Sequence, residues 1–106
     1  MPKYLVRASY TQSGIAGVLR EGGSSRVKAI QELAASVGGS ADAIYWALGE
    51  DDFFMIADLP DNTAAAAVAA TVGATGTARV TTVPLLSADE VDQIASKSVE
   101  YRPPGA

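Results

Sequence analysis

Two arginines and three aromatic residues, from three separate segments of the sequence, are the side chains best suited to bind a small molecule together. They are Arg7, Arg79, Tyr10, Tyr45 and Trp46. A guanidinium offers a planar pair of donors to a carboxylate, and an aromatic wall shields such a contact from water. We therefore expect these residues to bind a small organic anion if the fold brings them together. In the alternative interpretation, the arginines form salt bridges across a subunit interface and the aromatics belong to the core.

A second candidate anion site lies in a glycine-rich segment. Gly22, Gly23 and Ser24 lead into a helical pattern, with Arg20 just before them and Arg26 just after. Free backbone N–H groups at a helix N-terminus, aided by the helix dipole, can bind a carboxylate or phosphate. The structural alternative is a kink between a short helix and a longer one, with the serines as caps. The segment lacks the spacing of a P-loop.

Three carboxylates follow Gly49 directly, at Glu50, Asp51 and Asp52. Oxygen ligands of this kind can bind Mg²⁺ or Ca²⁺, and a carboxylate can also act as a general base. The alternative, which we favour, is a solvated hairpin turn in which Asp52 hydrogen-bonds to its own backbone. EF-hand spacing is absent.

The sequence contains neither cysteine nor histidine. This excludes disulfides, and it excludes the zinc, haem and other transition-metal sites that need thiolate or imidazole. A catalytic Ser-His-Asp triad and a cysteine nucleophile are excluded as well. Any proton transfer must use Asp, Glu, Lys, Tyr or Arg side chains. We expect no metal and no organic cofactor.

The charge balance argues against two classes of partner. The net charge is −4, and the eight basic residues are scattered along the chain. Binding to nucleic acid or to an anionic membrane surface draws on clustered Lys and Arg, so we expect neither partner. No apolar stretch approaches the length of a membrane span, and the N-terminus lacks a signal-peptide core. We therefore expect a cytoplasmic protein.

The periodicity of apolar residues predicts a mixed α and β chain. In the first strand, Leu5, Arg7 and Ser9 share one face. The predicted strands cover residues 4–10, 40–48, 53–59 and 77–83, with a short helix at 15–20 and longer helices at 25–37, 62–72 and 88–97.

Particular residues mark the predicted boundaries of these elements. Ser24 or Ser25 is expected to cap the first long helix, and Asp61 the second. Ser87 opens the last helix with a capping box. We expect Pro84 to end the fourth strand, and residues 49–52 to form a tight turn, with residues 11–14 as another turn.

This order of elements predicts one domain over residues 1–100 and a flexible tail at 101–106. Two βαβ halves with right-handed crossovers give an α+β, ferredoxin-like domain with an antiparallel four-stranded sheet in the order 4-1-3-2. Both crossover helices then cover one face. The other face carries Arg7, and also Arg79 if Val80 faces the helices. Its apolar character predicts that the last helix, a second subunit, or both cover it.

Four separated blocks of the sequence resemble the GYD-domain family in order and spacing. They are KYLVRASYT from residue 3, LREGGSSR at 19–26, YWALGEDDFFMIADLPDNTAAAA at 45–67 and TTVPLLSADEVD at 81–92. Gly49 and Asp52 match the Gly-Tyr-Asp pattern of the family's hairpin turn, whereas Asp51 stands where an aromatic residue is usual. The resemblance implies a ferredoxin-like subunit of the dimeric α/β-barrel type, in which two sheets close over one another through their open faces.

The leading functional hypothesis is a homo-oligomer that binds a small organic anion or aromatic molecule at the open sheet face. Folds of the resembled type also host monooxygenases and isomerases, so a cofactor-independent enzyme that uses Tyr or Asp for proton transfer is an alternative. A structural or regulatory oligomer without ligand is a third hypothesis.

Overall fold

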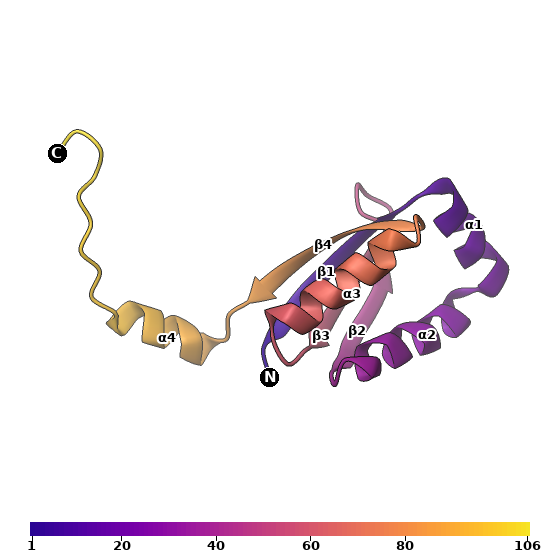
Figure 1. Ribbon diagram of the computed structural model, residues 1–106, viewed down its shortest axis with the longest axis horizontal. Coiled ribbons are helices and arrows are strands. Elements are labelled where there is room, and N and C mark those ends of the chain that lie inside the picture. The colour runs from indigo at the N-terminus through magenta and orange to yellow at the C-terminus, as the bar shows by residue number, and fades with distance from the viewer.

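The sheet and its helices follow the predicted topology. The computed structural model describes residues 1–106 (Figure 1). The elements in chain order are β1 (Lys3–Tyr10), α1 (Gln12–Glu21), α2 (Gly23–Ser36), β2 (Ser40–Trp46), β3 (Phe53–Asp58), α3 (Asn62–Ala74), β4 (Ala78–Leu85) and α4 (Ala88–Ser96). The strands pair antiparallel in the order β2-β3-β1-β4, which confirms the predicted ferredoxin-like α+β fold. None of the helices combines the length and apolar character that crossing a membrane requires.

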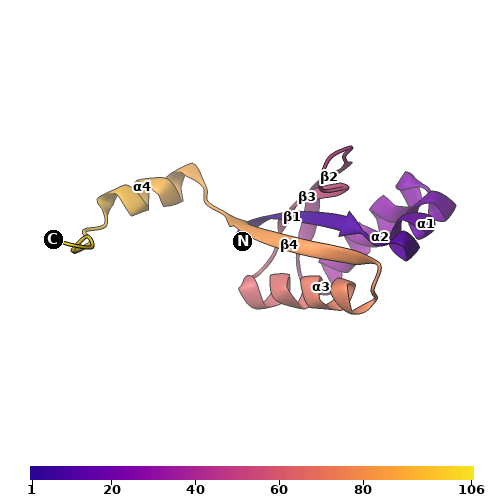
Figure 2. The same cartoon turned by 90° about the horizontal axis from the view of Figure 1, so that it is seen from above.

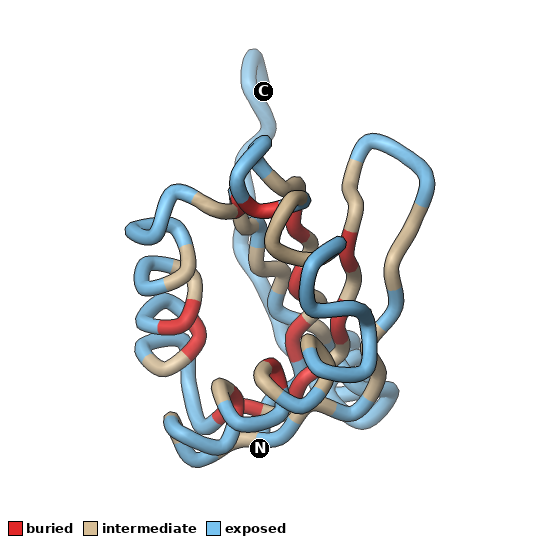
Figure 3. The backbone as a smooth tube through the Cα atoms, turned by 90° about the vertical axis from the view of Figure 1, so that its right-hand side faces the viewer, coloured by how far each residue is buried: buried red, intermediate tan, exposed pale blue.

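The two faces of the sheet have different surroundings. On the helix face, alternate residues of the central strands are buried beneath α2 and α3, as Val6 and Met55 illustrate. Figure 3 shows buried residues on the strands and on the sides of the helices that face them. On the other face, called here the open face, no helix covers the sheet (Figure 2). Strand register places these residues on it: Leu5, Arg7, Ser9, Tyr45, Phe54, Ile56, Arg79, Thr81 and Val83.

Two predicted helix caps are confirmed. The Asp61 carboxylate accepts a hydrogen bond from the backbone N–H of Ala64 at 2.9 Å, at the start of α3. Ser87 and Glu90 form a reciprocal capping box at the start of α4, with distances of 3.0 and 3.2 Å. These bonds satisfy N–H groups that the first turn of a helix leaves without partners.

The start of α2 differs from the prediction. The helix begins at Gly23, and its N-cap is Gly22 rather than Ser24 or Ser25. Gly22 has φ 81°, and its N–H also closes α1 by donating to the carbonyl oxygen of Val18 at 2.8 Å. Because one glycine both ends α1 and starts α2, the serines fall inside the first turn of α2 and cannot cap it.

Two further boundaries were predicted wrongly. Residues 11–14 do not form a turn: Thr11 is the N-cap of α1, and its hydroxyl accepts a hydrogen bond from the N–H of Gly14 at 3.3 Å. Pro84 does not end β4, which runs on to Leu85. Pro84 is tolerated because β4 is an edge strand, where a missing N–H can face away from the ladder.

The last helix does not cover the open face of its own chain. Helix α4 and the residues after it extend beyond the end of β4, away from the sheet (Figures 1 and 2). All residues from Leu86 to Ala106 are exposed, among them the apolar side chains of Val91 and Ile94. The prediction that the last helix covers the open face is therefore wrong for the chain by itself.

Candidate functional site

The two arginines singled out in the sequence lie at one hollow on the open face. In the β1–β4 register, Arg7 pairs with Thr81 and Ser9 pairs with Arg79, so the two arginines are diagonal neighbours. The hollow has a volume of about 430 Å³ and no hydrophobic lining residue. Its lining consists of Arg7, Ser9, Glu50, Asp51, Arg79 and Thr81.

Arg7 is the more constrained of the two arginines. Its Nη1 lies 3.4 Å from Oδ2 of Asp51, and its Nε is buried without a hydrogen-bond partner. The Ser9 hydroxyl donates to the carbonyl oxygen of Glu50 at 3.1 Å and lies 3.3 Å from Oδ1 of Asp51. Arg79 is exposed and takes part in none of the four ion pairs of the chain. The hollow therefore holds one weakly paired guanidinium and one free guanidinium.

The three aromatic residues do not form a single wall beside these arginines. Tyr45 lies on the open face opposite Phe54 and is 69% exposed, but it does not line the hollow. Trp46 and Tyr10 lie on the helix face. There the indole Nε1 donates to the Tyr10 hydroxyl at 3.1 Å, and the Trp46 ring packs edge-on against Phe53 with centroids 5.6 Å apart.

The arginines on either side of the glycine-rich segment border a second, separate hollow. This hollow has a volume of about 170 Å³ between α1, α2 and the end of β1, and Arg20 and Arg26 line it. Arg26 Nη1 lies 3.5 Å from Oε2 of Glu21. Gly22, Gly23 and Ser24 are exposed and do not line the hollow.

The acidic turn does not gather its carboxylates. Asp52 accepts a hydrogen bond from the backbone N–H of Tyr10 at 2.9 Å, whereas Asp51 faces Arg7 and Ser9. No group of three acidic side chains in the chain is placed to hold a metal ion. The segment is also longer than the predicted tight turn, because β2 already ends at Trp46.

A lysine at the other end of the open face joins three strands. Lys3 Nζ lies 2.7 Å from Oδ2 of Asp42 and 3.0 Å from Oδ2 of Asp58. The hydrogen bonds that Lys3 donates, first to Asp42 and then to Asp58, raise the pKa of Lys3 above its ordinary value of 10.5. The same bond to Lys3 lowers the pKa of Asp42 below its ordinary value of 3.8.

These pKa shifts predict the pH range in which the cluster of Lys3, Asp42 and Asp58 stabilises the fold. The pKa of Asp42 is lower in the folded than in the unfolded chain. Its ionised carboxylate therefore stabilises the fold fully above pH 3.8, the unfolded pKa, and this stabilisation is lost as the pH falls through the folded pKa. The contribution of Lys3 is lost as pH rises through a folded pKa above 10.5. In the Lys3→Gln variant, NMR titration should show the pKa of Asp42 moving up towards 3.8. An unchanged Asp42 pKa in that variant would contradict the cluster.

A cleft on the helix face has no counterpart in the sequence predictions. It lies between α2 and α3 and has Ile30, Leu33 and Val72 among its lining residues. Their helical spacing identifies them only as apolar positions that face the sheet. Whether two helices meet above a sheet or leave a cleft depends on where each one packs, which periodicity does not reveal.

The fold and the arginine hollow define a ferredoxin-like α+β protein with one helix-covered and one open sheet face. The chain belongs to the GYD domain family, whose family model matches residues 4–95. Neither the curated proteins nor the solved structures contain a match to the chain.

Proposed function

We propose that the protein is a homo-oligomer that binds a small organic anion at the open-face hollow. The observation that carries this proposal is the diagonal pair Arg7 and Arg79 in one hollow without hydrophobic lining. A protein with a net charge of −4 repels anions at long range. Binding one therefore requires local positive charge, and two guanidinium groups on adjacent strands supply it with directed donors.

The Arg7–Asp51 pair is weak enough for a ligand to compete with it. The N–O distance is 3.4 Å, and the side chains are 39% and 22% exposed. Partly exposed ion pairs contribute at most about 1 kcal/mol. A carboxylate placed between the arginines can use the exposed guanidinium of Arg79 and the Nη donors of Arg7 that the long contact to Asp51 leaves free.

The apolar part of the open face supports the oligomer. Leu5, Phe54, Ile56 and Val83 neighbour one another across three strands. A contiguous apolar patch that no part of the chain covers is typical of a protein–protein interface. A second copy would cover this patch and would also close the arginine hollow from the outside.

Helix α4 is a second reason to expect a partner copy. An isolated helix of nine residues is marginal in water, because nucleation costs more than so few hydrogen bonds return. Val91 and Ile94 are three residues apart on one side of α4, so this side is suited to packing against another surface.

An oligomer without ligand is the second candidate function. The Arg7–Asp51 pair favours it, because Asp51 already gives Arg7 a carboxylate within the chain. Ligand binding by the arginine variants separates the two candidates.

Arg7→Gln and Arg79→Gln should each weaken the binding of a small carboxylate found in a thermal-shift screen. Hydrogen bonds to charged groups contribute roughly 1.5–3 kcal/mol, so each change should raise the dissociation constant by about tenfold or more. Titration calorimetry measures the constants. Arg102→Ala, which removes an exposed arginine after α4, is the matched control and should bind normally. The site assignment is wrong if both glutamine variants keep full affinity, or if they dissociate into monomers before ligand is added.

A further inference from the structure

The cleft on the helix face is an apolar space that the chain leaves unfilled. Helix α2 packs beside β2 and α3 beside β4, which leaves β1 and β3 as the floor between them. The cleft has a volume of about 80 Å³, and eleven of its thirteen lining residues are hydrophobic. Ile30 and Leu33 line it from α2, Val72 from α3 and Met55 from β3. Protein interiors are normally packed without such space, and water held there would find few polar partners.

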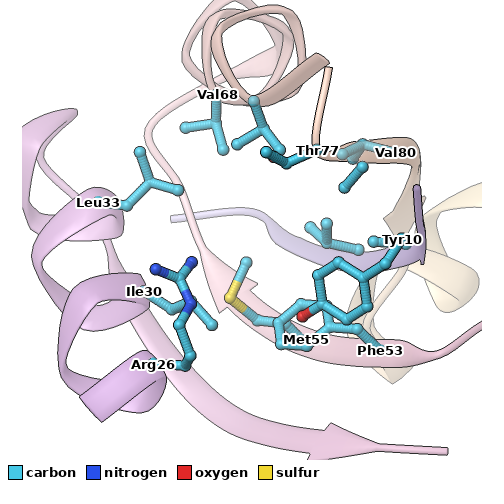
Figure 4. Close-up of a pocket in the computed structure, with 13 residues that line it drawn as sticks. Tyr10, Arg26, Ile30, Leu33, Phe53, Met55, Val68, Thr77 and Val80 are labelled. Atoms are coloured by element: carbon cyan, nitrogen blue, oxygen red, sulfur yellow. The ribbon is translucent and has the colours of Figure 1, made fainter. Parts of the chain in front are cut away.

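The cleft is polar at one end only. Its charged or hydrogen-bonding side chains are Arg26 of α2, Tyr10 at the end of β1 and Thr77 just before β4 (Figure 4). All three also line the 170 Å³ hollow that Arg20 borders. The two spaces therefore meet at these three side chains, and the opening there carries Arg20 and Glu21 besides Arg26.

The polar groups at this opening have unused donors. Arg26 contacts only Glu21, at 3.5 Å, although a guanidinium carries five N–H donors. The Tyr10 hydroxyl accepts a hydrogen bond from the Trp46 indole, so its own hydrogen is free to donate. Each group therefore has a donor available to a carboxylate bound at this opening.

We propose that the cleft and the adjoining hollow form one binding site for a small amphiphilic carboxylate. A single ring or a short branched chain occupies the cleft between α2 and α3, and the carboxylate lies on Arg26 with Tyr10 beside it. The volumes limit the apolar part, because sites for drug-sized ligands are typically about 300–1,000 Å³. This site lies on the opposite face of the sheet from Arg7 and Arg79, so it does not depend on the function proposed above.

Three probes separate the two parts of this site. Benzoate carries both a ring and a carboxylate, benzyl alcohol keeps the ring without the charge, and acetate keeps the charge without the ring. Trp46 is the only tryptophan and contacts Tyr10, so its single indole N–H resonance reports binding in NMR titrations. Benzoate should shift this resonance, and its dissociation constant should be about tenfold lower, or lower still, than that of benzyl alcohol or acetate.

Two variants locate the probe within the site. Arg26→Gln should weaken benzoate by about tenfold and leave benzyl alcohol unchanged, because only benzoate uses the guanidinium. Val72→Phe should fill the cleft and abolish binding of both ring-bearing probes. Lys28→Gln is the matched control, since it removes an exposed positive charge from the same helix outside the cleft. It should leave benzoate binding at the cleft unchanged.

The outcomes decide the proposal without reference to the open-face hollow. It is overturned if benzoate leaves the Trp46 resonance in place at millimolar concentration, or if Arg26→Gln binds benzoate as well as the unchanged chain does. It is also overturned if folded Val72→Phe protein keeps its affinity. Should Val72→Phe fail to fold, the Arg26→Gln result decides alone, because Arg26 is partly exposed and its loss leaves no core cavity.

Discussion

Gly14→Ala is expected to destabilise the protein by about 3 kcal/mol, the largest single-methyl effect in the chain. A Cβ at this position would overlap the carbonyl oxygen of Thr77 and lie 2.8 Å from its carbonyl carbon. The obstacle is backbone, so no side-chain rotation can relieve it. The same carbonyl accepts a hydrogen bond from the N–H of Thr11 at 2.9 Å, and the Thr11 hydroxyl donates to the carbonyl of Gly76 at 2.7 Å. Moving this segment aside would break the junction between β1, α1 and β4.

Gly17→Ala in the same helix is the matched control. The nearest atom to its added Cβ is the end of the flexible Arg20 side chain, at 3.8 Å. Alanine should therefore stabilise α1 by about 0.5–1 kcal/mol relative to glycine. Chemical denaturation followed by circular dichroism measures both variants. Equal stability of the two variants would show that α1 does not pack on Thr77 as closely as the structure has it.

The orientation of β1 could be predicted because its apolar and polar residues alternate without ambiguity. In β1 the buried residues Tyr4, Val6 and Ala8 alternate with partly polar ones, so both its faces follow from the sequence. In β4 both faces carry β-branched residues, and periodicity alone does not orient Arg79. The pairing of Ala8 with Val80 puts Val80 on the helix face and therefore Arg79 on the open face.

The aromatic residues of β2 show where sequence reasoning reached its limit. The register of β2 with β3 shifts between Ala41 and Ala43, and an irregularity of this kind changes which residues face each side of a sheet. The sequence therefore left open whether Tyr45 or Trp46 shares the open face with Arg7. The register puts Tyr45 there and puts Trp46 on the helix face, where it bonds to Tyr10.

Asp51 illustrates a contact that depends on loop geometry. The sequence placed it in a tight turn, beyond the ends of both strands. The connection from β2 to β3 is longer, and it folds back so that the N–H of Asp52 donates to the carbonyl of Ala8 at 2.9 Å. This bond to β1 brings Asp51 to Arg7 and Ser9. No pattern of residue types within 49–52 indicates such an attachment to a third strand.

Ile56→Lys is expected to convert the proposed oligomer into a monomer. Ile56 lies on the open face opposite Leu5 of β1 and Ala43 of β2, at the centre of the apolar patch. A second copy that covers this patch would have to bury the lysine ammonium without a partner, which costs several kcal/mol. Since each 1.4 kcal/mol is a factor of ten, association should weaken by about 100-fold or more.

Light scattering at micromolar concentration measures this change directly. The unchanged chain should have at least twice the mass of one 10.8 kDa subunit, and Ile56→Lys should have the mass of one subunit. Ala67→Lys adds the same charge on an exposed position of α3 and should leave the oligomer intact. Circular dichroism must show that both variants are folded, so that a monomer reflects a lost interface. The open face is excluded as the interface if a folded Ile56→Lys variant stays oligomeric. It is also excluded if the unchanged chain is a monomer, because a single copy then leaves Leu5, Phe54 and Val83 facing water.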